Sequence, residues 1–261
     1  MESEIITSAE PGGAPPGRSP WGLGATIGLS VLCLALFVVL QIMVAIVFVV
    51  VEMGRDPGAD LAAVSTTIGN NGLLIAVSTL VSAVPCVALV ILFSSGREGG
   101  ASTYLRLGRP KLGAALGWLG ALVVLLVGSD LLSMALDQAV VPEFMLEACS
   151  TAGFLPLLLL ALIVAAPVFE ELLFRGFLFR GIEASPLGGI GAVVITAAVW
   201  AAIHLQYSLF HMGLVFVMGI FLGVVRLRTG STALTVLLHS STNLVATVQA
   251  LAAAGMIGNW G

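Results

Sequence analysis

Long apolar runs, separated by short polar stretches, follow one another along nearly the whole chain. A helix needs about 20 predominantly apolar residues to cross a bilayer, and seven stretches approach or exceed that length. The predicted spans are Ala25–Val51, Leu73–Phe93, Leu112–Leu136, Gly153–Phe174, Gly188–His204, Leu209–Val225 and Ser231–Ala253. The pattern predicts an all-α fold, a polytopic transmembrane helical bundle of seven to eight helices.

The ends of the chain and its composition fit this interpretation. Residues 1–20 are polar and rich in Pro and Gly, which predicts a disordered cytoplasmic tail. Residues 21–261 are expected to form a single transmembrane domain. Of the 261 residues, 59% are hydrophobic and 9% are charged, whereas soluble domains carry about 25% charged residues. The first apolar run is too long for a signal peptide, so we expect it to remain as a membrane anchor.

The basic residues predict how the bundle is oriented. With the N-terminus inside and seven spans, nine of the ten basic residues lie on the cytoplasmic side, and Arg55 lies on the other. The nine are Arg18, Arg97, Arg106, Arg109, Lys111, Arg175, Arg180, Arg226 and Arg228. Cytoplasmic loops are enriched in Lys and Arg. We therefore expect a multi-pass protein of the cell (plasma) membrane with a cytoplasmic N-terminus.

Small residues recur at four-residue spacing within the predicted spans, as in Gly219–Gly223 and Ala197–Ala201. Residues four apart share a helix face, and small side chains there allow two helices to approach closely in lipid. The spacing predicts tight helix packing at these positions.

Two classes of function find no support in the sequence. No basic cluster interleaved with aromatic residues is present, so no nucleic-acid partner is expected. The cysteines, Cys33, Cys86 and Cys149, form no CxxC pair, which argues against a disulfide framework or a thiolate metal site. The composition predicts that a lipid bilayer surrounds the chain.

Ionisable groups inside predicted spans are costly and therefore mark functional sites. Glu171 and Arg175 are four residues apart, with the acid first, so they can form an ion pair on one helix face. The adjacent Glu170 points about 100° away and has no local partner. His239 and Asn243 also share a face.

A carboxylate without a local partner, two imidazoles and an amide can together hydrolyse a peptide bond. Glu170 with His204 could orient and deprotonate a water molecule, while His239 and Asn243 could donate hydrogen bonds to the oxyanion. Alternatively, the two histidines, with or without Glu170, could hold Zn²⁺ and activate its bound water. No HExxH motif is present. These residues leave the zinc and the metal-free mechanisms both open.

Three short patterns in this region resemble the signature motifs of the CAAX protease and bacteriocin-processing enzyme family. They are EExxxR (Glu170, Glu171, Arg175), an aromatic residue four positions before histidine (Trp200, His204) and HxxxN (His239, Asn243). The flanking words FEELLFRGFLFRGI and VVRLRTGS match as well. The resemblance covers about Leu157 to Val245. The family includes type II CAAX prenyl proteases and bacterial proteins once called abortive-infection proteins.

The resemblance implies an intramembrane endopeptidase with its catalytic core at about residues 153–250. By position, Glu170 is the implied catalytic base, His204 its partner, and His239 and Asn243 the oxyanion stabilisers. Glu171 and Arg175 are implied as supporting residues. The family is described both as a metallopeptidase, which would place a metal on Glu170, His204 and His239, and as metal-free. Trp200 departs from the commoner phenylalanine, a difference that we interpret as minor.

The substrate expectation rests on this analogy alone. The short chain, rich in Ala, Gly and Val, looks bacterial, which favours a peptide, bacteriocin or membrane-protein substrate over a prenylated one. Two rivals are a non-catalytic membrane scaffold or immunity protein of the same family and an ion-coupled transporter.

Helix geometry adds one further requirement. At 1.5 Å per residue, Glu170 and His239 lie ~13–15 Å from the cytoplasmic boundary and His204 lies ~24 Å from it. We therefore expect the fourth span to continue past Arg175 toward Glu183 and the fifth to be tilted, so that the three side chains come within about 10 Å.

Overall fold

The computed structural model describes residues 19–257 except 57, 59, 62–63, 65–67 and 98, and every regular element in these residues is a helix. Most of the predicted tail, residues 1–18, lies outside the described part. The elements are α1 (Leu23–Arg55), α3 (Gly72–Ser95), α4 (Gly100–Tyr104), α5 (Leu112–Ala135), α6 (Glu143–Ser150), α7 (Leu155–Leu159), η1 (Leu160–Ala165), α8 (Ala166–Glu171), η2 (Leu172–Leu178), α9 (Phe179–Glu183), α10 (Gly188–Ala202), α11 (Leu209–Thr229) and α12 (Thr232–Ala253).

The predicted fold class is confirmed, and the chain is a multi-pass membrane protein. Six helices of the described part are long and apolar enough to cross a bilayer, including one continuous helix from Leu155 to Glu183. The fifth predicted span differs, because α10, the helix that corresponds to it, has 15 residues. It is about 22 Å long at 1.5 Å per residue, shorter than the ~30 Å hydrocarbon layer.

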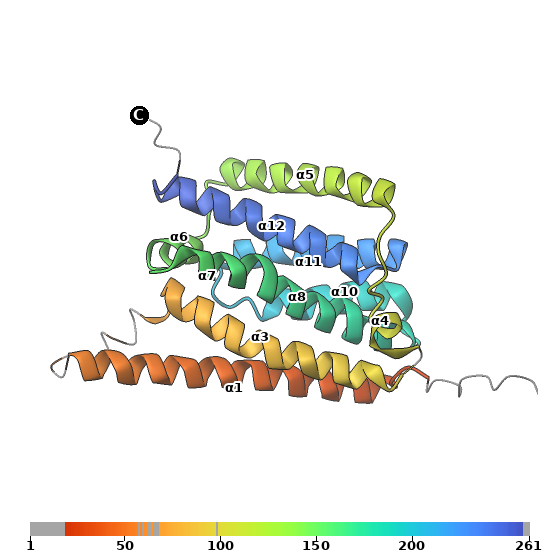
Figure 1. The fold of residues 1–261 in the computed structure, drawn as a ribbon. Helices are drawn as coiled ribbons and strands as arrows, with labels where there is room; N and C mark the ends of the chain where they lie inside the picture. The colour runs from red at the N-terminus through yellow and green to blue at the C-terminus, as the bar shows by residue number, and fades with distance from the viewer. Residues whose placement is uncertain are drawn as a thin grey trace, which may run out of the picture.

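The helices lie side by side in one bundle (Figure 1). Helices α1 and α3 form one edge of the view, and α5 with α12 forms the other. The helix from Leu155 to Glu183, α10 and α11 lie between these edges, while the short helices α4 and α6 lie at opposite ends of the bundle. Residues 155–229 therefore supply the centre of the bundle.

The predicted small-residue packing is confirmed where α10 meets α11. A Cβ atom on Gly219 would lie 2.9 Å from the Cβ of Ala197 and 3.2 Å from an indole carbon of Trp200. A Cβ atom on Gly223 would lie 3.1 Å from a methyl of Val193. The small residues allow the two backbones to approach this closely. Such packing holds helices together in lipid, where no hydrophobic drive acts between them.

The fourth span continues past Arg175 to Glu183, as helix geometry required. Two π-helical segments, η1 and η2, flank α8, which carries both glutamates. Pro167 has no N–H group and its ring crowds the preceding turn. The wider turn of η1 accommodates that crowding, and π segments of this kind often occur at functional sites. The predicted tilt of the fifth span stays a prediction.

Candidate active site

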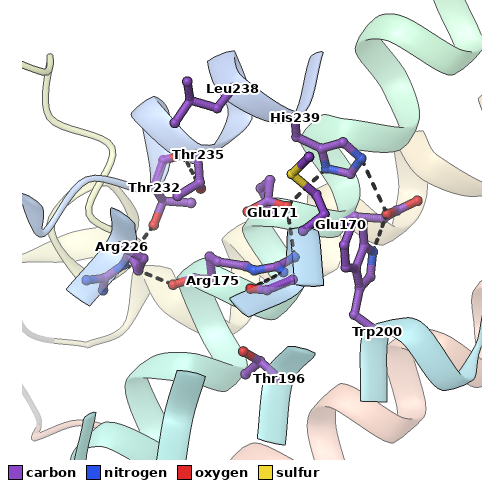
Figure 2. A network of polar contacts seen from close by, with 12 residues as sticks. Glu170, Glu171, Arg175, Thr196, Trp200, Arg226, Thr232, Thr235, Leu238 and His239 are labelled. Atoms are coloured by element: carbon purple, nitrogen blue, oxygen red, sulfur yellow. Dashed lines mark hydrogen bonds and ion pairs between the residues drawn. The ribbon is translucent and has the colours of Figure 1, made fainter. Parts of the chain in front are cut away.

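Two adjacent carboxylates in α8 lie at the centre of the bundle and face different partners (Figure 2). The side chain of Glu171 is fully buried, whereas the side chain of Glu170 is 18% exposed. This difference follows from the ~100° turn between successive helical residues. Glu171 therefore belongs to the packed interior, whereas Glu170 is partly exposed.

Glu171 and Arg175 form the ion pair that their spacing predicts. A guanidinium N–H group of Arg175 donates to Glu171 Oε1 at 2.9 Å, and both side chains are fully buried. Arg175 also donates to the carbonyl of Gly219 at 3.2 Å, and its guanidinium lies 4.6 Å from the centre of the Trp200 ring. The pair neutralises a buried charge and ties three helices together at the site.

His239 lies between the two glutamates. Its Nδ1 is 3.0 Å from Glu171 Oε1, and its Nε2 is 4.0 Å from Glu170 Oε2. A carboxylate only accepts hydrogen bonds, so Nδ1 must be the donor to Glu171. Glu171 thereby fixes the ring orientation and directs Nε2 toward Glu170, an arrangement in which a second carboxylate orients a working histidine.

Trp200 reaches the same carboxylate from α10. Its indole Nε1–H donates to Glu170 Oε2 at 2.5 Å, and its ring packs edge-on against His239 with centroids 5.2 Å apart. Phenylalanine has no such donor. Trp200 therefore makes a hydrogen bond to Glu170 that phenylalanine could not make, and the weight of this departure stays a prediction.

His204 makes no described contact with Glu170, although the sequence predicts that the two residues act together. Its Nδ1 lies 2.7 Å from the carbonyl of Trp200, and since a carbonyl only accepts, Nδ1 donates. Its ring packs edge-on against Trp200 at 5.0 Å and stacks on Tyr207 at 5.9 Å. Among the described contacts, His204 is connected to Glu170 through Trp200 rather than directly.

Asn243 points toward the helix that carries the glutamates. Its amide donates to the carbonyl of Leu162 in η1 at 2.7 Å. In a π-helical turn, that carbonyl would pair with the N–H of residue 167, which is a proline. Asn243 supplies the missing donor, so its observed contact is interhelical, and its role at an oxyanion stays a prediction.

Pattern reasoning missed two functional candidates, Trp200 as a hydrogen-bond donor and Tyr207 as a neighbour of the site. The position of Trp200, one helical turn before His204, could have indicated that both face the same side. Tyr207 follows the end of α10, and no periodic pattern extends through a turn. Its place beside His204 is visible only in three dimensions.

The side chains do not fit the zinc site that the resemblance suggests. Catalytic zinc takes three protein ligands. Glu170 and His239 oppose each other at 4.0 Å, whereas His204 is connected to them only through Trp200 among the described contacts. Among the described residues, no group of three His, Cys, Asp or Glu side chains could hold a metal ion. As they are placed, these side chains offer two ligands rather than three.

The comparisons with known proteins agree with the motifs over part of the chain. Residues 152–245 match the family model for type II CAAX prenyl endopeptidase Rce1-like proteins. The chain is also similar to an uncharacterized 24.3 kDa protein of Escherichia coli, 38% identical over 129 residues. That alignment covers 47% of this chain and 58% of the E. coli protein. No solved structure matches the chain significantly.

Proposed function

We infer that this chain, whose residues 152–245 carry a domain of the Rce1-like protease family, is an intramembrane endopeptidase that uses Glu170 as its base. The observation that carries the inference is the opposition of Glu170 Oε2 and His239 Nε2 at 4.0 Å inside a helical bundle. This distance is too long for a direct hydrogen bond. A water molecule bound beside the pair can hydrogen-bond to both groups.

The hydrolytic step follows from these positions. Glu170 removes a proton from the water, and the resulting hydroxide attacks the carbonyl carbon of the substrate. When protonated at Nε2, His239 donates a hydrogen bond to the oxyanion of the tetrahedral intermediate. The C–N bond then breaks, and Glu170 returns its proton to the leaving amine. Water is consumed, and the products are a new carboxylate and a new amine.

The surrounding residues position the reacting groups. Trp200 donates to Glu170 and keeps the carboxylate directed toward His239. Glu171 accepts from His239 Nδ1 and is itself neutralised by Arg175. The substrate is a peptide or protein that reaches the bundle in the membrane. The distribution of basic residues supports a cytoplasmic N-terminus, and we propose the plasma membrane as the location.

The experiment is comparative peptidomics of membranes that contain equal amounts of the wild type or Glu170→Gln. Glutamine keeps the size of the side chain but cannot take a proton. We expect peptide termini that appear only with the wild type and persist after treatment with a metal chelator. Identical termini, with both proteins folded, would contradict the proposal and favour a scaffold or immunity role. Termini that vanish with the chelator would instead support a metal-dependent site.

A further inference from the structure

The turn between α10 and α11 follows a helix that is too short to cross the hydrocarbon layer of a bilayer. Helix α10 ends at Ala202 after 15 residues, about 22 Å from its first residue, and α11 begins at Leu209 beside it. A helix of this length that begins at the boundary of the ~30 Å hydrocarbon layer ends inside that layer. Backbone without helical hydrogen bonds is stable at that depth only where protein or a water-filled cavity surrounds it.

A polar cavity of about 340 Å³ adjoins this turn. Its volume lies in the range of about 300–1,000 Å³ that is typical of ligand sites. The lining comes from the segment before α3, from the connection between α5 and α6 with the first residues of α6, and from the turn into α11 with the start of that helix. Its residues are Asn70, Gln138, Ala139, Pro142, Glu143, Phe144, Gln206, Tyr207, Ser208 and His211.

Tyr207 connects this cavity to the candidate active site. It lines the cavity, and its ring stacks on His204 at 5.9 Å and packs edge-on against Phe144 at 5.8 Å. A tyrosine hydroxyl is protonated at neutral pH and can both donate and accept a hydrogen bond. Tyr207 therefore joins the cavity lining to the ring of His204 and adds no charge between them.

The lining is suited to peptide backbone rather than to an ion or an acyl chain. Asn70, Gln138 and Gln206 carry amides, which donate and accept as a peptide bond does. His211 accepts from the Ser208 hydroxyl through Nδ1 at 2.8 Å and donates through Nε2 to the Ala139 carbonyl at 2.9 Å. One ring nitrogen accepts and the other donates, which is the pattern of a neutral imidazole. Glu143 is the single carboxylate of the lining.

We propose that this cavity binds the extended segment of the peptide substrate that flanks the scissile bond, entering from the side of the membrane opposite the arginine-rich end. The segment passes Tyr207 and His204 to reach the space between Glu170 and His239. The proposal rests on the endopeptidase function proposed above and adds the substrate class, namely polypeptides with an uncharged polar segment exposed on the non-cytoplasmic side.

The test uses a single introduced cysteine. The three native cysteines are buried, so a membrane-impermeant, negatively charged methanethiosulfonate should modify only an accessible substitute. Gln206→Cys places the thiol in the cavity lining. Leu205→Cys is the matched control, since Leu205 is the adjacent residue, is 80% exposed and does not line the cavity. Both variants, each with and without Glu170→Gln, are treated in spheroplasts and analysed for peptide termini.

After treatment, Gln206→Cys should lose the Glu170-dependent termini, whereas Leu205→Cys and the wild type should keep them. Complete modification of Gln206→Cys with unchanged termini would overturn the cavity as the substrate path. Equal loss in Leu205→Cys, or modification only in inverted vesicles, would overturn it as well. If untreated proteins show no Glu170-dependent termini, the endopeptidase function itself fails, which is a separate result.

Discussion

Helix α1 and the helix from Leu155 to Glu183 are both long and apolar, yet they occupy opposite environments. Among the buried residues of α1 are only Thr26, Ser30 and Cys33, and its large aliphatic side chains are mostly exposed. The helix from Leu155 to Glu183 lies in the centre and buries Glu171 and Arg175 completely. The more apolar helix therefore faces outward, and the helix with charges faces inward.

This difference shows how the bilayer inverts a rule of soluble proteins. Lipid tails solvate aliphatic side chains as well as a protein interior does, so apolar character alone gives a helix no reason to be buried. Charged and polar groups need partners that lipid cannot supply. In this chain, a fully buried polar network marks the centre of the bundle. Substitutions can test whether stability and cleavage depend on these central contacts and not on the side chains that face lipid.

The largest effect on stability is expected from Arg175→Ala. It leaves Glu171 as an uncompensated buried charge, which costs about 3–5 kcal/mol when one partner of a buried pair is removed. Thermal unfolding in detergent can be followed with a fluorogenic maleimide, because all three cysteines are buried. An unfolding temperature equal to that of the wild type would contradict the central role of the pair.

The double variant Glu171→Leu/Arg175→Met separates stability from positioning. Replacing a buried ion pair with apolar side chains is often neutral or stabilising, so much of the lost stability should return. Cleavage should not return, because His239 Nδ1 loses its acceptor at 3.0 Å.

A smaller effect, on the rate of cleavage, is expected from Trp200→Phe. The variant removes the donor to Glu170 Oε2, and a hydrogen bond to a charged group contributes about 1.5–3 kcal/mol, or about ten- to a hundredfold in rate. The measurement is the rate at which Glu170-dependent termini form. Trp118→Phe in α5 is the control at the edge of the bundle and should leave the rate unchanged. An unchanged rate in Trp200→Phe would show that aromatic packing alone suffices.

The smallest effect is expected from Gly219→Ala. The new methyl group would lie 2.9 Å from the Cβ of Ala197, and such overpacking typically costs about 1–3 kcal/mol. Gly213→Ala is the control on the same helix, since a Cβ atom there meets nothing within 4 Å. The unfolding temperature should fall for Gly219→Ala alone. Equal temperatures would mean that α10 and α11 separate without cost.

The fold was predictable because a helix satisfies its own backbone hydrogen bonds, which makes it the favoured conformation of a long apolar run in lipid. Runs such as Leu112–Leu136 coincide with observed helices almost to the residue. The short helices α4 and α6 were not predicted, since they are too brief for periodicity to show. The fifth span was predicted as Gly188–His204, and its helix ends two residues earlier, at Ala202. Ile203 continues the apolar run, so hydrophobicity alone does not reveal where the helix ends.

The candidate site was predictable to the extent that spacing encodes direction. The ion pair of Glu171 and Arg175 follows from four-residue spacing, and the separate direction of Glu170 follows from adjacency. Two hydrogen bonds, from Trp200 to Glu170 and from Asn243 to the Leu162 carbonyl, each join two different helices. Their distances depend on how the helices are rotated about their axes, which apolar sequence leaves almost unspecified.

The two wide turns on either side of Glu170 and Glu171 have a consequence for how this protein can evolve. Each π segment sets the angular phase of the helix that follows it. Deleting one residue from an α-helical turn ahead of Glu170 would rotate both carboxylates by about 100°, away from partners on two other helices. A π-helical turn that loses one residue can instead close to an α-helical turn and keep the phase of the helix that follows. A one-residue deletion can therefore be absorbed inside η1 or η2 but not inside α8, which carries both carboxylates. The spacing of the chain here is itself a functional parameter, and its tolerance for deletion is confined to the two wide turns.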